Sequence, residues 1–238
     1  MKRLDILIAE HQNISREKAK ELIKKGFVSL KGKILLKSSI LIENLDYVNI
    51  SQPKTNYVSR GGYKLEHAIS TFGIDISEKI CVDIGSSTGG FTDCLLQHGA
   101  TLVYAIDVGT EQLHSSLHNH SQIISLENTN IRTKPNIEQS DIIVIDVSFI
   151  SLSLVLPIAF QMLNKNGICI ALIKPQFEVG LKNLNKQGVV KDKKTIDKCL
   201  KNIENISLDI GFKIFGKTTS PITGKTGNIE YFLALRKE

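Results

Sequence analysis

The spacing of hydrophobic residues changes near residue 57, and this change divides the chain into two parts. In the first part, apolar positions within 4–8 recur at helical spacing and predict a short helix. A second helix is expected to begin after Ser15 as N-cap and to end at Gly26, with its apolar face turned inward. Short β runs complete a compact α+β module at 27–30, 34–36 and 47–50.

The second part alternates between apolar runs and segments compatible with helices. The runs are rich in Ile and Val and lie at 80–84, 102–106, 123–126, 142–145 and 168–173. This alternation predicts a parallel sheet with helices on both faces, a Rossmann-like α/β fold. Two later runs, at 212–218 and 230–235, have no helix between them and predict a hairpin added to the sheet.

A polar stretch separates the two parts. Residues 51–56 read SQPKTN, which includes Pro53 and shows no hydrophobic period. We therefore expect a first domain over 1–51, a linker over 52–58 and a second domain over 59–238.

Charge gives the first part a distinct character. Residues 1–60 hold 12 Lys/Arg against 6 Asp/Glu, so the whole net charge of +6 lies there. The remaining residues balance at 18 and 18, which suggests a near-neutral body. A basic region of this kind suits a polyanion, although a merely solvated surface is the alternative.

Other features predict a cytoplasmic protein without stable membrane insertion, as a monomer or weak dimer. The four cysteines are far apart and form no C-x-x-C pair, which is typical of buried thiols in a reducing compartment. Asp5 and Glu10 interrupt the apolar run that a signal peptide needs. The 18-residue stretch 147–164 lacks charge but contains several Ser, Asn and Gln residues, so we expect a strand end and a buried helix there.

The strongest local signal is CVDIGSSTGGF at 81–91, a strand followed by a glycine-rich turn and a helix. Glycines at such a turn let a ligand approach the backbone closely. The spacing is neither the dinucleotide fingerprint nor a P-loop. Asp107 follows the next strand, where a carboxylate accepts hydrogen bonds from ribose hydroxyls. A nucleoside-containing ligand is expected, with a tight turn and helix cap as the alternative.

Five more segments carry a family resemblance: SRGGYKL (59–65), LENTNIR (126–132), DVSFISL (146–152), IKPQFE (173–178) and SPITGKTGNIEYF (220–232). In this order they resemble the TlyA family of hemolysin-A-like rRNA 2'-O-methyltransferases, whose catalytic domain is FtsJ-like. RLD at 3–5 and SREKAKELIKKGFVSLKGK at 15–33 resemble the S-four-type RNA-binding domain. The resemblance implies a class I methyltransferase form of the Rossmann fold, S-adenosylmethionine as cofactor, and ribosomal RNA or ribosomal subunits as partners.

The resemblance also implies a reaction centre of two lysines and two carboxylates: Lys64, Asp146, Lys174 and Glu230. A ribose 2'-hydroxyl has a very high pKa, so its attack on a sulfonium methyl needs a base and an in-line position. Lys174 is the expected base; a lysine accepts a proton only when neutral, which burial and a second cation favour. Lys64 and Asp146 would position the hydroxyl and tune Lys174, while Glu230 would orient Lys64 or the ribose.

The remaining implied contacts fall into two groups. Around the cofactor we expect Ser59, Arg60, Asp83, Gly85, Ser86, Thr88, Gly89, Gly90, Phe91 and Asp107, with Glu127 and Asn128 near the adenine. Asn128 departs from the larger or basic residue expected between the Glu and the Thr-Asn pair. RNA contacts are expected from Arg3, Arg16, Lys20, Lys24 and Lys25. Histidines 114, 118 and 120 lack partners at ligand spacing, so no metal site is expected.

The predicted function is S-adenosylmethionine-dependent methylation of the ribose 2'-oxygen of cytidine in ribosomal RNA. The target is expected in large-subunit rRNA, with small-subunit rRNA also open. One alternative is a membrane-active hemolysin. The sequence contains no strongly amphipathic, purely apolar helix, which argues against this alternative. Another is a non-catalytic ribosome-assembly factor, which the intact set of four reaction-centre residues disfavours. A pseudouridine synthase has no use for the glycine-rich turn.

Overall fold

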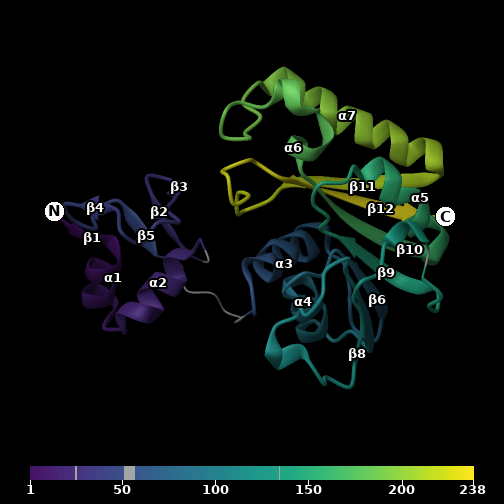
Figure 1. Cartoon of the computed structure of the whole chain (residues 1–238), viewed down its shortest axis with the longest axis horizontal. Helices are drawn as coiled ribbons and strands as arrows, with labels where there is room; N and C mark the ends of the chain where they lie inside the picture. The colour runs from purple at the N-terminus through teal and green to yellow at the C-terminus, as the bar shows by residue number, and fades with distance from the viewer. Residues whose placement is uncertain (25, 51–56, 134) are drawn as a thin grey trace. The chain divides into compact units, whose positions relative to one another are not determined.

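The computed structural model describes residues 1–24, 26–50, 57–133 and 135–238. The chain forms two compact units, Met1–Asn56 and Tyr57–Glu238, and each has its own elements (Figure 1). The predicted linker residues 52–56 lie outside the described residues. Tyr57 belongs to the second unit, where it is buried and packs edge-on against Tyr63 with ring centroids 5.0 Å apart.

The first unit combines two helices with short strands. Its elements are α1 (Leu4–Gln12), α2 (Arg16–Lys24), β2 (Val28–Leu30), β3 (Lys33–Ile34) and β5 (Val48–Ile50), with the antiparallel sheet order β3-β2-β5. As predicted, Ser15 caps α2: its Oγ accepts from the Lys18 amide at 3.2 Å. A further pair, β1 (Lys2–Arg3) with β4 (Leu41–Ile42), was not predicted, because two-residue strands show no periodicity.

Helices α1 and α2 pack on a small core. Its buried members are Leu4, Ile8, Ala19, Leu22, Ile23, Val28 and Ile42. The inward face expected for both helices is confirmed. The charged side chains of α2 therefore lie on its outer face, because the apolar positions at helical spacing are all turned inward.

The second unit contains one seven-stranded sheet in the order β11-β12-β10-β9-β6-β7-β8. Its strands are β6 (Ile80–Ile84), β7 (Leu102–Ile106), β8 (Ile123–Leu126), β9 (Ser140–Ile145), β10 (Leu163–Ile173), β11 (Phe212–Thr219) and β12 (Tyr231–Lys237). Strands β6 to β10 run parallel, whereas β12 lies antiparallel between β10 and β11. The Rossmann-like α/β fold and the added hairpin are confirmed.

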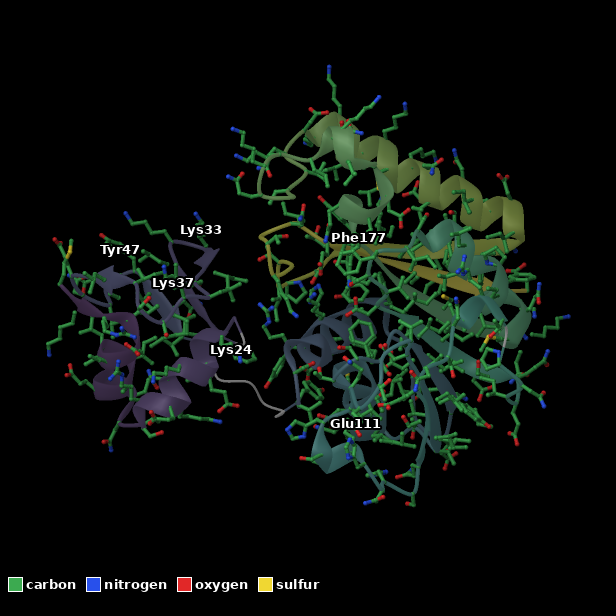
Figure 2. All side chains as sticks on the ribbon, viewed as in Figure 1. Lys24, Lys33, Lys37, Tyr47, Glu111 and Phe177 are labelled. Atoms are coloured by element: carbon green, nitrogen blue, oxygen red, sulfur yellow. The ribbon has the colours of Figure 1, made fainter. Side chains whose placement is uncertain are left out.

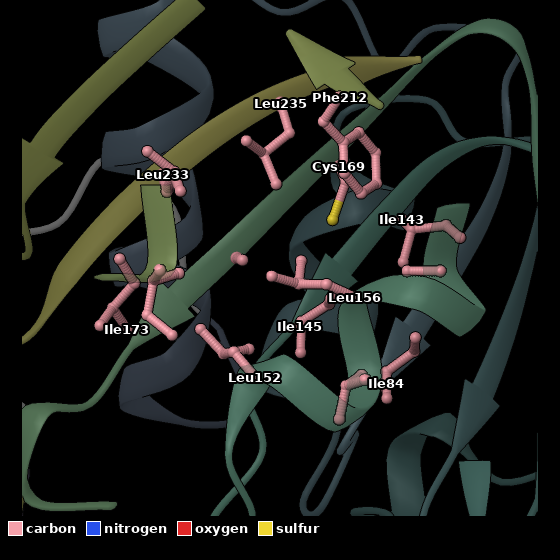
Figure 3. Close-up of a cluster of buried hydrophobic side chains, with 14 of the residues drawn as sticks. Ile84, Ile143, Ile145, Leu152, Leu156, Cys169, Ile173, Phe212, Leu233 and Leu235 are labelled. Atoms are coloured by element: carbon pink, nitrogen blue, oxygen red, sulfur yellow. The ribbon is translucent and has the colours of Figure 1, made fainter. Parts of the chain in front are cut away.

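Helices cover both faces of this sheet (Figure 1). They are α3 (Arg60–Phe72), α4 (Gly90–Gln97), α5 (Leu152–Met162), α6 (Pro175–Glu178) and α7 (Lys193–Ile210), with 3-10 turns at Ser115–Leu117, Ile131–Thr133 and Leu181–Asn183. The uncharged stretch 147–164 forms the loop after β9, helix α5 and the first two residues of β10. The apolar residues of α5 are buried against the sheet (Figure 3). Among the described residues, no helix has the length and apolar content to cross a membrane.

The main core lies between the sheet and the layer of α5 and α7. Leu152 and Leu156 of α5 contact side chains of β9 and β10, among them Ile143 and Cys169 (Figure 3). All four cysteines are buried and free, as the sequence predicted. Burial raises the pKa of Cys81 and of Cys199 to about 12, so neither is a reactive thiolate near neutral pH.

Candidate active site

The predicted reaction-centre residues gather at the edge of the sheet where the parallel strands end. Asp146 follows β9 and Lys174 follows β10, and these two strands are neighbours. Ile173 of β10 pairs with Tyr231 of β12, so Lys174 and Glu230 meet the sheet side by side. Open α/β sheets place their ligands at this edge.

These four residues form two separate ion pairs, each between a lysine and a carboxylate. Lys64 Nζ lies 2.5 Å from Glu230 Oε2, and both side chains are buried, with 11% and 3% of their surfaces exposed. Lys174 Nζ lies 2.7 Å from Asp146 Oδ1 and also donates to Ser148 Oγ at 2.9 Å. Each lysine is thus held in one place by a carboxylate.

The pairing has a chemical consequence for Lys174. A carboxylate next to a lysine favours the charged ammonium form, whereas a second cation or loss of water favours the neutral amine. The partner that the structure gives Lys174 is the carboxylate of Asp146. Lys174 can therefore act as a base only if a change in its surroundings favours the neutral amine.

The loop between β11 and β12 shapes the position of Glu230. The Ser220 amide donates to the Glu230 carbonyl at 2.8 Å, which closes the loop at its base. A Cβ atom at Gly224 would lie only 2.6 Å from Glu230 Oε1, so a larger residue there would displace the carboxylate from this position. The sequence reasoning gave Gly224 no role. Its position six residues before Glu230, in the TGKTGNIE segment, is the sequence feature that could have indicated a role.

Glycines let the ends of β6 and α4 approach their neighbours. Gly85 has φ +86°, and a Cβ there would lie 2.7 Å from the Asp146 carbonyl oxygen. This close contact brings the turn after β6 next to the reaction centre. Gly90, at the start of α4, packs so tightly on α3 that a Cβ would lie 2.1 Å from Ser59 Oγ and 3.0 Å from the Gly62 nitrogen. The SRGG and TGG segments therefore face each other.

Ser59 begins the helix that carries Lys64. Its Oγ accepts from the Gly61 amide at 3.2 Å and caps α3, while Arg60 is the first residue of that helix. Ser86 is buried and Thr88 is exposed at the glycine-rich turn. Cofactor contacts of these residues stay predictions.

Asp83 and Phe91 face the protein interior. Asp83 is fully buried, and its Oδ2 accepts from Thr92 Oγ1 at 2.7 Å, while Oδ1 accepts no hydrogen bond from any described residue. Burial raises the pKa of Asp83 to about 7, against the effect of the Thr92 hydroxyl. The Phe91 ring packs on Phe232, with centroids 6.2 Å apart. An unsatisfied buried carboxylate oxygen behind the glycine turn suits a cationic ligand.

Asp107 holds the glycine turn through backbone amides. Its two oxygens accept from the Ser87 and Gly109 amides, each at 2.8 Å. A carboxylate oxygen accepts more than one hydrogen bond, so the half-exposed Asp107 retains capacity for ribose hydroxyls. These residues fit the nucleoside part of S-adenosylmethionine.

The region predicted for adenine is organised by Glu127 and Asn128. Glu127 accepts from the Glu111 amide at 2.6 Å and the Gln112 amide at 3.0 Å, and these bonds lower its pKa. Asn128 has φ +51°, a conformation that asparagine tolerates better than most residues, which explains its presence here. A hollow of about 340 Å³ borders Glu127 and includes His118, whose Nε2 lies 2.8 Å from the Leu113 carbonyl.

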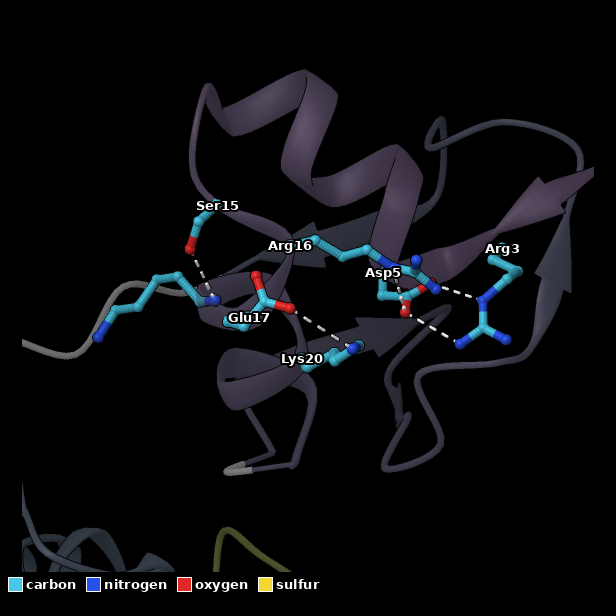
Figure 4. Close-up of polar contacts among 7 residues, drawn as sticks. Arg3, Asp5, Ser15, Arg16, Glu17 and Lys20 are labelled. Carbon is cyan, nitrogen blue, oxygen red and sulfur yellow. Dashed lines mark hydrogen bonds and ion pairs between the residues drawn. The ribbon is translucent and has the colours of Figure 1, made fainter.

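The predicted RNA contacts in the first unit form a partly paired basic surface. Arg3 and Arg16 both bind the buried carboxylate of Asp5, at 2.9 Å and 3.1 Å (Figure 4). Lys20 lies 3.7 Å from Glu17. Lys24 is exposed, as are Lys33 and Lys37, which the sequence reasoning did not select (Figure 2). Lys25 lies outside the described residues.

Comparison with known proteins agrees with this geometry. Residues 57–237 match the FtsJ-like methyltransferase family. Hemolysin A of Brachyspira hyodysenteriae is 43% identical over 96% of this chain and 97% of its own length. The 23S rRNA (cytidine-2'-O)-methyltransferase TlyA of Campylobacter jejuni is 40% identical, over 97% of both chains.

A solved structure from Streptococcus thermophilus, described as a hemolysin, is 38% identical and superposes with a TM-score of 0.76. It covers 99% of this chain and 88% of that chain. The similarity thus extends through both units and includes all four reaction-centre residues within the matched span. The chain belongs to the TlyA family of FtsJ-like methyltransferases.

Proposed function

We propose that this enzyme transfers a methyl group from S-adenosylmethionine to the ribose 2'-oxygen of a cytidine in ribosomal RNA. The observation that supports this reaction is the pair of lysine–carboxylate contacts, Lys64–Glu230 and Lys174–Asp146, at the carboxyl edge of the sheet. The Campylobacter jejuni relative is named for this reaction on 23S rRNA and matches nearly the whole chain. Large-subunit rRNA is therefore the proposed substrate.

The bound cofactor supplies an electrophilic methyl group on a sulfonium. The glycine turn at Gly85 and the carboxylates of Asp83 and Asp107 would hold it. The 2'-oxygen would take this methyl group, with the sulfonium as leaving group, and the hydroxyl proton would have to leave. The residues of this chain serve that proton transfer and the in-line alignment of the hydroxyl.

Lys174 accepts the proton once its own proton has been released. RNA that covers the site removes water from Lys174, and desolvation favours the neutral amine. Asp146 and Ser148 keep the Nζ atom in position throughout.

Lys64 and Glu230 act as a fixed hydrogen-bonding pair. Among the described residues Lys64 donates to Glu230, which occupies one N–H group of its ammonium, and two donors remain for the ribose. Because both side chains are buried, the pair has little freedom to reorient. Lys64 therefore positions the 2'-oxygen and Glu230 positions Lys64.

The first unit contributes binding of structured RNA through its arginines and lysines. Arg3 and Arg16 are fixed by Asp5 and still present outward N–H groups, with 38% and 45% of their side chains exposed. Such groups contact phosphates without reading base sequence. We assign the enzyme to the cytoplasm, where its RNA substrate is made, as a monomer or weak dimer.

The test is transfer of radiolabelled methyl from S-adenosylmethionine to separated bacterial large and small ribosomal subunits. The unmodified enzyme should label the large subunit, and Lys174→Ala should lower the rate at least about a hundredfold, the usual contribution of a general base. Lys165→Ala is the matched control, because Lys165 is an exposed lysine near the other end of β10, the strand that Lys174 follows.

Calorimetric titration with S-adenosylmethionine accompanies each variant. Normal turnover by Lys174→Ala with intact cofactor binding would remove Lys174 as the base. No label in either subunit from the unmodified enzyme, despite cofactor binding, would reject ribosomal RNA as the substrate.

A further inference from the structure

The charge of the second unit, which we call the catalytic unit, is unevenly distributed along its sequence. Residues 61–173 contain five Lys/Arg against eleven Asp/Glu, whereas residues 174–238 contain thirteen against seven. The near-neutral body expected from the overall balance is thus two regions of opposite sign. The basic region begins at Lys174 itself.

Five exposed lysines of this region lie close together in the sequence, and we call them the lysine segment: Lys182, Lys186, Lys191, Lys193 and Lys194. No ion pair joins any of them to another described residue. Asp192, within the segment, is engaged elsewhere: its Oδ2 accepts from the Thr195 amide at 2.9 Å and caps α7. Residues 182–194 hold five lysines against the single acid Asp192, so this stretch carries a net charge of +4.

Other lysines of the same unit differ from the lysine segment. Lys201 and Lys217 both pair with Glu204, and Lys213 pairs with Glu238. The fold thus supplies acidic partners along α7 and β11 but supplies none to the lysine segment in the part of the chain that is described. Unpaired like charges at close spacing attract a polyanion.

Hydrogen bonds give the lysine segment a defined shape. Asn185 Oδ1 accepts from the amides of Gln187 and Val189, each at 2.9 Å. The buried Asn228 donates from Nδ2 to the Gly188 carbonyl at 2.9 Å and accepts at Oδ1 from the Val190 amide at 3.0 Å. The segment is therefore fixed to the β11–β12 loop.

That loop is the one that carries Glu230, two residues after Asn228. Lys225 adds an exposed cation on the same loop. The 180–192 stretch (green) and the β11–β12 loop (yellow) lie together at one end of the sheet (Figure 1). Two hydrogen bonds thus join the stretch that carries the lysine segment to the β11–β12 loop, which positions Glu230.

We propose that the lysine segment, with Lys225, is an RNA-contact surface of the catalytic unit that binds backbone phosphates next to the target ribose. This inference rests on the proposed function. Lysines are compact point charges that suit phosphates and carry no base specificity. The surface holds the RNA beside the reaction centre, while the arginines of the first unit bind elsewhere on the RNA.

The test compares two triple variants that remove the same charge. Lys182→Gln/Lys186→Gln/Lys191→Gln alters the lysine segment, and Lys201→Gln/Lys213→Gln/Lys217→Gln alters lysines that have acidic partners. Binding to rRNA extracted from bacterial large subunits is measured at several salt concentrations, together with KM and kcat for methyl transfer. Thermal melting checks that both variants are folded.

The lysine-segment variant should raise the dissociation constant for rRNA and the KM at least about tenfold at moderate salt, with kcat and cofactor affinity unchanged. The slope of log K against log salt should fall by about two, because each neutralised phosphate contributes about 0.7–0.9. The paired-lysine variant should change each value less than about threefold.

Equal weakening by both variants, or unchanged rRNA binding by the lysine-segment variant, would overturn the proposal. So would a lysine-segment variant that loses binding to phosphatidylglycerol vesicles but keeps rRNA binding. Absence of methyl transfer by the unmodified enzyme would reject the proposed function instead, and the rRNA-binding comparison would still decide this inference.

Discussion

Asp5 and Asp83 are both completely buried, one in each unit, yet their surroundings act on them in opposite directions. The guanidinium of Arg3 and that of Arg16 bind Asp5 and hold its pKa at about 2. Asp83 accepts from the neutral hydroxyl of Thr92, and burial raises its pKa to about 7. Burial alone therefore does not fix the charge of a carboxyl group; its partners do.

The comparison also separates two uses of a buried acid. Asp5 is an anion that organises two cations on the outer surface of the first unit (Figure 4). Asp83 lies behind the glycine turn, with one oxygen that has no hydrogen-bond donor among the described residues. The first arrangement favours the charged carboxylate, and the second favours the protonated carboxyl group.

The largest expected effect concerns Asp83→Asn. In the ligand-free enzyme, Asp83 retains its proton to about pH 7, whereas the unfolded chain loses it near pH 3.8. The folded state therefore binds more protons, and its stability should fall as pH rises from about 4 to 7, by at most about 4 kcal/mol. Asparagine cannot ionise, so Asp83→Asn should remove this slope.

Hydrogen exchange of the β6 amides at several pH values measures the effect in the second unit alone. Asp209→Asn, an exposed acid on α7, is the control. A slope that persists in Asp83→Asn would assign the pH dependence to another group.

Asp5→Asn should have the next largest effect, with the opposite sign. The depressed pKa of Asp5 contributes stability that is complete above about pH 4 and is lost as pH falls toward 2. Since Arg3 and Arg16 are partly exposed and screened by water, we expect a loss of about 1–2 kcal/mol at pH 6. Exchange of the α1 amides should show it, and equal protection in both proteins at pH 6 would contradict it.

Thr92→Val sharpens the comparison by removing the hydroxyl that donates to Asp83. The loss should be about 1 kcal/mol, and larger at pH 8 than at pH 5, because a hydroxyl binds a carboxylate more strongly than a carboxylic acid. Urea unfolding at both pH values measures it. A loss independent of pH would show that the methyl and hydroxyl packing of Thr92 matters more than its bond to Asp83.

The smallest effect is expected from Glu17→Gln. Glu17 is 81% exposed, and its carboxylate lies 3.7 Å from Lys20 Nζ. Exposed pairs of this kind contribute less than about 1 kcal/mol, so the change in unfolding free energy should stay within about 0.5 kcal/mol and vanish at high salt. A change as large as that of Asp5→Asn would mean that burial does not distinguish the two acids.

Sequence patterns predicted the sheet because its strands are apolar runs with clear ends. The bounds expected for 80–84, 102–106 and 123–126 agree with β6, β7 and β8. Asp146 and Lys174 directly follow two of these runs, and in the structure both lie at one edge of the sheet. The β1–β4 pair escaped prediction, because strands of two residues have neither period nor length.

Contacts between distant segments required the three-dimensional structure. The close packing of Gly62 on Gly90, and of Gly224 on Glu230, depends on how helices and loops meet, which no local spacing encodes. Counting charges over a long stretch of sequence also hid a local difference in charge. The balance of acids and bases after residue 60 hid a basic region whose position became clear only with the β11–β12 loop in view.

The position of β12 has a consequence for how the enzyme is made. This strand lies between β10 and β11 and follows Glu230, which pairs with Lys64 at a separation of 166 residues. While the chain is still being translated, Lys64 leaves the ribosome long before its carboxylate partner does. A nascent chain that has not yet released β12 lacks the strand between β10 and β11, so the sheet and the Lys64–Glu230 pair are completed only after synthesis has passed this strand.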